Sequence, residues 1–133
     1  MANVIRAREI ETDTTYEEGL AIDFGVSDAS VGSKRLTMGH TIIPPGNRNR
    51  WHYHGACEAA MYIARGRVRV LWQEDGVVRH ADLGPGSFFY VAPFDRHTQE
   101  NLSDTEPVEM IFAYAGVANK EAAETVFVPD PRL

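Results

Sequence analysis

Short runs of β-branched and aromatic residues, each ended by turn residues, recur along the chain and constrain its fold more than any other feature. Such runs, bounded by Gly, Pro, Asn and Asp, are typical of β-strands. The clearest hairpin signal is Asp75-Gly76, a two-residue turn between the apolar alternation of residues 68–72 and Val77-Val78. We therefore expect an all-β protein with strands near residues 36–43, 51–54, 59–64, 67–73, 77–81, 87–91, 97–102 and 108–115.

Eight short strands at this spacing are typical of a sandwich or a small barrel that closes around a pocket. The one helical signal is residues 119–125, where Asn119 precedes Lys-Glu-Ala-Ala-Glu and can cap a helix of one or two turns. We expect a barrel core over residues 36–115. Residues 1–35 and 116–133 are less strongly patterned and are interpreted as arms that pack on the barrel or on a second subunit.

Length and charge exclude several classes of protein. A chain of 133 residues has room for a single core. The net charge of −6 argues against binding to the phosphate backbone of nucleic acids. The N-terminus is acidic and has no apolar leader, and no run of about 20 apolar residues occurs, so we expect a cytoplasmic protein without a membrane partner. Cys57 is the only cysteine and is expected to be a small buried side chain.

A candidate metal site lies between residues 46 and 58. His52 and His54 alternate as residues on one face of a strand do, Glu58 follows the next bend, and His97 comes later in the chain. Three imidazoles and one carboxylate suit iron, manganese, nickel, zinc or copper. A single histidine in a β-protein is more often structural, but the spacing of these residues after Pro-Pro-Gly favours a metal site. We predict His52, His54, Glu58 and His97 as the ligands.

These residues resemble the two sequence motifs of the cupin superfamily. Gly46, His52, His54 and Glu58 match the first motif, with Gly66 near its closing glycine. Gly86, Pro93, His97 and Asn101 follow the second motif. The resemblance covers roughly residues 36–115 and implies a jelly-roll-like β-barrel that holds one metal ion. Seven residues rather than six separate Glu58 from Gly66, so counting back from the glycine would place the ligand slot at Ala59.

The same strand alternation suggests residues that line the pocket. Arg48 and Arg50 share the parity of the histidines and could clamp an anionic substrate, although they could equally lie in a solvated loop. Tyr62 and Trp72 could form a pocket wall, with Tyr62 moving a proton, or could be ordinary core.

The function that these features favour is a mononuclear metal enzyme acting on a small carboxylate-bearing or enolisable substrate. Iron or manganese is the favoured metal, and with Fe(II) we expect dioxygenase chemistry, because four protein ligands on an octahedral ion leave two positions open. Two alternatives stay open: a lyase, isomerase, decarboxylase or cyclase that uses the metal without redox, and a non-catalytic small-molecule-binding protein. Small cupins are often dimers, and a homodimer is expected.

Overall fold

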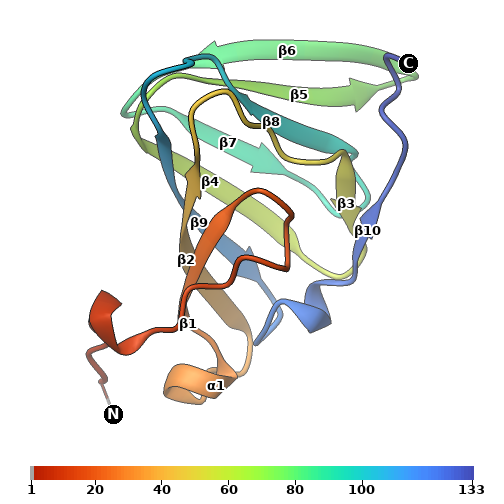
Figure 1. The fold of residues 1–133 in the computed structure, drawn as a ribbon. Coiled ribbons are helices and arrows are strands. Elements are labelled where there is room, and N and C mark those ends of the chain that lie inside the picture. The colour runs from red at the N-terminus through yellow and green to blue at the C-terminus, as the bar shows by residue number, and fades with distance from the viewer. Residues whose placement is uncertain (1) are drawn as a thin grey trace.

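Two antiparallel β-sheets of five strands face one another in the computed structural model, which describes residues 2–133 (Figure 1). The first sheet has the order β1-β2-β9-β4-β7, with bounds Ala21–Val26, Leu36–Ile43, Val108–Ala115, Glu58–Arg65 and Phe88–Val91. The second has the order β10-β3-β8-β5-β6, with bounds Thr125–Phe127, His52–His54, His97–Asn101, Val68–Glu74 and Val77–Leu83. The all-β, jelly-roll-like barrel expected from the sequence is confirmed.

Turn chemistry sets the ends of the strands as expected. Asp75 and Gly76 have φ values of 50° and 76°, so both central residues of the β5–β6 hairpin adopt the left-handed conformation of a type I′ turn. Gly66 also has a positive φ of 86°, and a side chain there would collide with the carbonyl oxygen of Pro107. This glycine therefore fixes the end of β4 against the start of β9.

Three short helices complete the fold of residues 2–133: η1 (Ala7–Glu9), α1 (Asp28–Val31) and η2 (Glu121–Ala123). The predicted helix near residue 119 is present as the 3-10 turn η2. Asn119 Oδ1 accepts a hydrogen bond from the backbone N–H of Ala122 at 2.7 Å, which is the capping role expected of that asparagine. None of the helices in residues 2–133 is long and apolar enough to cross a membrane.

The core lies between the sheets because alternate side chains of each strand point inward. In β4 the inward residues are Ala59, Met61 and Ile63, which are buried, while their neighbours are exposed. The inward residues of β9 are Val108, Met110, Phe112 and Tyr114, which are paired in register with β4. This alternation decides which residues of β4 can reach the interior.

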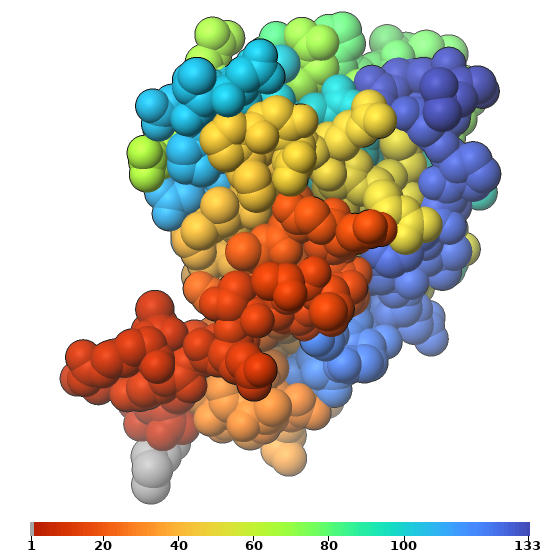
Figure 2. Space-filling model, in the orientation of Figure 1, coloured from red at the N-terminus to blue at the C-terminus, as the bar shows by residue number. Residues whose placement is uncertain are grey.

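Both ends of the chain contribute strands to the barrel. β1 pairs with β2 at one edge of the first sheet, and β10 pairs with β3 at one edge of the second. Between η1 and β1, residues 13–22 fold back on themselves: Asp13 and Ile22 exchange two backbone hydrogen bonds of 2.7 and 2.9 Å. Figure 2 shows the first residues projecting from the body, whereas the residues that follow lie against the front of the barrel.

Candidate metal centre

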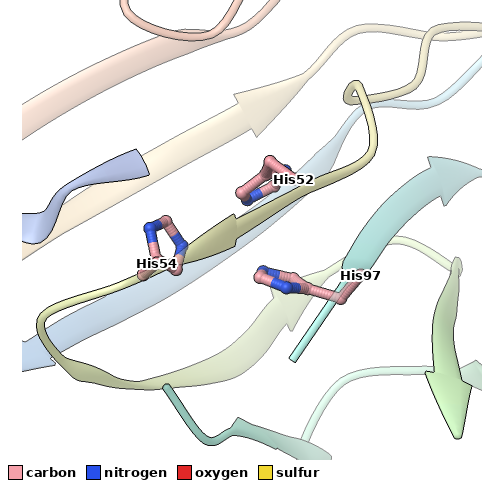
Figure 3. A group of neighbouring side chains, drawn as sticks. All are labelled: His52, His54 and His97. Carbon is pink, nitrogen blue, oxygen red and sulfur yellow. The ribbon is translucent and has the colours of Figure 1, made fainter. Parts of the chain in front are cut away.

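Three histidines from two neighbouring strands converge in the interior of the barrel. His52 and His54 are alternate residues of β3, and His97 on β8 is the register partner of His52. All three are buried, and one ring nitrogen of each lies within 4.8 Å of those of the others. Figure 3 shows the three rings turned toward one another. The structure thus brings together three of the four ligands predicted from the sequence.

The outer nitrogen of each ring is held by a hydrogen bond. A backbone carbonyl only accepts, so an Nδ1 bonded to one carries a proton, and in the neutral ring Nε2 then keeps a free lone pair. This arrangement is the one that orients histidines toward a metal. The contacts join Nδ1 of His52 to the carbonyl oxygen of Arg50 (2.6 Å), Nδ1 of His97 to that of Asp95 (2.9 Å), and Nδ1 of His54 to Oγ1 of Thr125 (2.8 Å).

Burial keeps two of the imidazoles neutral. Desolvation, with a smaller contribution from the charge of His52, lowers the pKa of His54 to about 3. The same two causes place the pKa of His97 well below its ordinary value. Both rings are therefore unprotonated near neutral pH, and a neutral imidazole is the form that binds a metal.

The histidines face a small cavity of about 30 Å³, more than the roughly 10–15 Å³ that one water molecule needs. Its apolar lining includes Met61, Met110 and Phe112. Its polar lining, besides the histidines, comes from the side chains Glu17, Thr41, Gln99 and Tyr114. The space suits an ion and a few ligand atoms.

The fourth predicted ligand, Glu58, lies on the other side of β4. Its side chain is on the exposed face of the sheet, and Oε1 accepts a hydrogen bond of 2.8 Å from the hydroxyl of Tyr90. The neighbouring Ala59 is buried and lines the cavity. The structure therefore does not place Glu58 with the histidines. The reason is the period of two along the strand, which turns residues 59, 61 and 63 inward.

Tyr62, the predicted proton-transfer residue, has the same parity along β4 as Glu58 and therefore also faces outward. Tyr62 is 38% exposed on the outer face and packs against Phe88, with ring centroids 5.0 Å apart. Trp72, predicted as a pocket wall, is partly buried against the core with its ring 5.9 Å from that of Phe89. Neither residue lines the histidine cavity.

Arg48 and Arg50 precede β3 in an irregular segment, so strand parity does not apply to them. Arg48 is exposed and forms an ion pair of 4.0 Å with Glu100. The guanidinium of Arg50 stacks on the ring of Phe127, 4.3 Å from its centroid. Both arginines line a surface groove with Asp130 and Arg132, not the histidine cavity. Asn49 between them is the residue that turns inward.

Sequence reasoning did not assign Glu17 or Tyr114 to the cavity. Glu17 comes from the folded-back segment before β1, and its Oε1 lies 3.6 Å from Nε2 of His52. Tyr114 comes from β9, and burial raises the pKa of its hydroxyl well above the ordinary value, so the phenol keeps its proton. One signal was available in the sequence: counting back from Gly66 places Ala59, and not a carboxylate, at the ligand position of the motif.

Three unprotonated imidazole nitrogens and a buried carboxylate form a donor set that fits a divalent transition metal. The held Nδ1 atoms show that the rings are already oriented for such an ion. The chain is thus a small β-barrel of two five-stranded sheets around a three-histidine group that could hold a metal ion.

The chain belongs to the cupin domain family, whose model matches residues 39–114. Among curated proteins it is similar to the polyketide synthase CurC of Streptomyces cyaneus, with 28% identity over 131 residues that cover 98% of this chain and 80% of CurC.

Solved structures with the same fold include oxalate decarboxylases. The Lactobacillus farciminis enzyme in complex with formate has 14% sequence identity and a TM-score of 0.76, with 91% of this chain and 34% of that chain covered. A variant of the Bacillus subtilis enzyme has 22% identity and a TM-score of 0.77, with 92% and 31% covered. Another structure of the Bacillus enzyme was used to study its Mn(II) centres. The chain thus spans about a third of the length of these decarboxylases.

Proposed function

We propose that this protein is a metal-dependent cupin enzyme in which His52, His54 and His97 hold one divalent transition metal. The observation that carries the proposal is the convergence of three buried imidazoles whose Nδ1 atoms are all held by hydrogen bonds. Structural histidines rarely leave three unprotonated nitrogens facing one cavity, because each buried lone pair without a partner costs free energy. A bound ion removes that cost.

Iron or manganese is favoured, and nickel, zinc and copper share the same ligand preferences. A bound ion of this kind would supply Lewis acidity and, in the case of iron, redox chemistry with O₂. Mn(II) in the oxalate decarboxylase of the same fold is consistent with manganese.

The residues of the cavity would position the substrate. Gln99 is held from both sides, since its Oε1 accepts a hydrogen bond from Asn49 (3.3 Å) and its Nε2 donates to the sulfur of Met61 (3.3 Å). The Tyr114 phenol is protonated and can donate a hydrogen bond to a substrate oxygen. The apolar side chains around Gln99 and Tyr114 exclude water, which strengthens the hydrogen bonds that these two residues make.

An enolisable carbonyl compound is the substrate class that we favour. Its oxygens could bind beside the histidines, while the Tyr114 hydroxyl holds a proton against the enol oxygen. The similarity to the polyketide synthase CurC supports this class, because polyketides carry repeated enolisable carbonyls. A clamp on a free carboxylate is less well supported, since Arg48 and Arg50 lie outside the cavity.

Dioxygenation is the reaction that we propose for the iron form. A non-redox reaction, such as isomerisation, cyclisation or decarboxylation, is the second candidate. The protonated phenol of Tyr114 in the cavity favours the second candidate, because a positioned proton donor is what such reactions need.

Metal reconstitution with product analysis tests both. The protein is purified without added metal, loaded separately with Fe(II), Mn(II) and Zn(II), and incubated with a β-diketone such as acetylacetone in air and under strict anaerobiosis. Consumption of O₂ by the Fe(II)-loaded protein, and not by the Mn(II) or Zn(II) forms, would support dioxygenation. Conversion without O₂ would support the non-redox reaction. Protein that holds only zinc and converts no enolisable compound under either condition would contradict the enzymatic proposal.

A further inference from the structure

We propose that Glu17 is a fourth protein ligand of the metal and takes the role that Glu58 was expected to have. The inference rests on the proposed metal centre and adds a ligand from a different part of the chain. It means that the segment before β1 closes the metal site, so that the barrel core of residues 36–115 does not contain the complete ligand set.

The first support is the distance of 3.6 Å between Oε1 of Glu17 and Nε2 of His52. Nitrogen and oxygen ligands lie about 2.0–2.2 Å from such metals, so two ligands of one ion are about 3.0 Å apart at 90° and about 3.4 Å apart at a tetrahedral angle. The observed separation is close to this range. It is also too long for a hydrogen bond between the two atoms.

The second support is the arrangement of lone pairs. In the neutral ring of His52, whose Nδ1 donates to the carbonyl oxygen of Arg50, Nε2 presents a lone pair to the carboxylate of Glu17. Two electron-rich atoms that face one another repel unless a cation lies between them. A metal ion bound by both atoms provides that cation.

Burial gives the third support. The side chains of Glu17 and His52 are 8% and 2% exposed. A carboxylate removed from water without a compensating charge is strongly unfavourable. Among residues 2–133, the basic side chain in contact with the Glu17 carboxylate is His52, whose ring is neutral when it binds a metal. The metal would supply the missing positive charge.

The chain path holds Glu17 in place. Asp13 Oδ1 accepts hydrogen bonds from the backbone N–H groups of Thr15 (2.8 Å) and Tyr16 (2.9 Å), and the backbone N–H of Leu20 donates to the carbonyl oxygen of Glu17 (3.1 Å). Leu20 is part of the buried core and fixes the end of this turn. The carboxylate therefore points inward from a defined turn.

Strand β4 supplies no carboxylate to the cavity. The β4 residues that line the cavity are Ala59 and Met61, and neither carries a carboxylate. Glu17 and Ala59 both line this cavity, so a carboxylate from either residue could face the same ion.

Mn(II) binding tests the proposal without any activity assay. Glu17→Gln keeps the shape of the side chain and removes its charge, Glu58→Gln is the matched control on the outer face, and His52→Ala reports on the metal centre itself. We expect Glu17→Gln to weaken Mn(II) binding at least about 100-fold, since loss of residues that only support ligands already costs 10–100-fold. Glu58→Gln should bind within about twofold of wild type, and the Mn(II) EPR spectrum should change in Glu17→Gln but not in Glu58→Gln.

The outcomes separate the two proposals. If His52→Ala loses the metal but Glu17→Gln keeps wild-type affinity and spectrum, the role of Glu17 is refuted and the metal centre stands. If the wild-type protein binds no Mn(II), Fe(II), Co(II) or Zn(II), both are refuted.

A rescue experiment adds a positive result. Moving the carboxylate to β4 in the double variant Glu17→Ala/Ala59→Glu should restore most of the affinity lost in Glu17→Ala. Circular dichroism checks that both variants are folded. A folded double variant that binds no better than Glu17→Ala would contradict the conclusion that both positions face the same ion.

Discussion

Thr125 Oγ1 lies 2.8 Å from Nδ1 of His54, so the last strand of the barrel holds a histidine of the candidate metal centre in its orientation. The same hydroxyl is hydrogen-bonded to the hydroxyl of Tyr16, which adjoins Glu17 in the folded-back segment. The two terminal parts of the chain thus meet beside the site. Residues that lie outside the matched range of 39–114 contribute to its geometry.

Thr125→Val should weaken metal binding by about 10–100-fold, which is the usual effect of losing a group that orients a ligand. Valine keeps the volume and β-branching of threonine but cannot accept the hydrogen bond from His54. Thr125→Ser keeps the hydroxyl and should bind within a few-fold of wild type. Titration calorimetry with Mn(II) measures both, and equal affinities for the two variants would show that Thr125 does not orient His54.

Tyr114→Phe should weaken the binding of an enolisable probe without loss of metal. The phenol is the hydroxyl donor that β9 presents to the cavity, so its removal takes away a hydrogen bond to the substrate oxygen. We expect the affinity for acetylacetone to fall by about fivefold, as for one hydrogen bond of about 1 kcal/mol. Tyr62→Phe is the matched control on the outer face. Identical affinities of Tyr114→Phe and Tyr62→Phe for acetylacetone would show that Tyr114 makes no hydrogen bond to it.

The ion pair of Asp13 with Lys120 predicts a pH-dependent contribution to stability. Burial raises the pKa of Asp13, but hydrogen bonds from Lys120, Thr15 and Tyr16 outweigh it and lower the pKa from 3.8 to about 2. A carboxyl whose pKa is lower in the folded state stabilises the fold above the unfolded pKa and loses this effect as the pH falls toward the folded pKa. The stabilisation is therefore complete above about pH 5 and disappears between about pH 4 and 2.

Asp13→Asn tests this difference. At pH 7 its free energy of unfolding should be about 1–2 kcal/mol lower than that of wild type, and the gap should close as the pH falls from 4 toward 2. Urea denaturation of both proteins at pH 7, 5, 4 and 3 gives the comparison. A gap of constant size over this range would mean that the asparagine acts through packing and not through charge.

Gly39 on β2 should not tolerate a side chain. A Cβ atom there would lie 2.7 Å from Cζ of Phe112 and would also collide with the carbonyl oxygen of Asp23 on the paired strand β1. Gly39→Ala is therefore expected to lower the free energy of unfolding by about 1–3 kcal/mol or more. Gly84→Ala has no heavy atom within 4 Å of its Cβ and serves as the control. Equal stability of the two variants would contradict the close packing of Phe112 against β2.

The strands and the three histidines could be predicted from the sequence because both depend on local patterns. Alternation and turn residues gave the bounds of β2 and β9, and the spacing of His52 and His54 followed from the period of a strand. His97 faces them because β8 pairs with β3. Its place in the site was expected from the resemblance to the second motif, but the pairing of the two strands was not.

The fourth position of the site was not predictable in the same way. A shift of one residue reverses the face of a strand, so the choice between Glu58 and Ala59 changed which side chain entered the cavity. Glu17 reaches the site through a turn closed by Asp13 and held by Lys120, a contact between distant parts of the sequence. No local pattern encodes such a contact.

Metal content, measured together with EPR spectra on protein purified without added metal, tests the central claim most directly. We expect about one divalent transition metal per chain in the wild-type protein and loss of stoichiometric binding in both His52→Ala and His97→Ala. Full metal content in either variant, with its fold intact, would contradict the three-histidine centre.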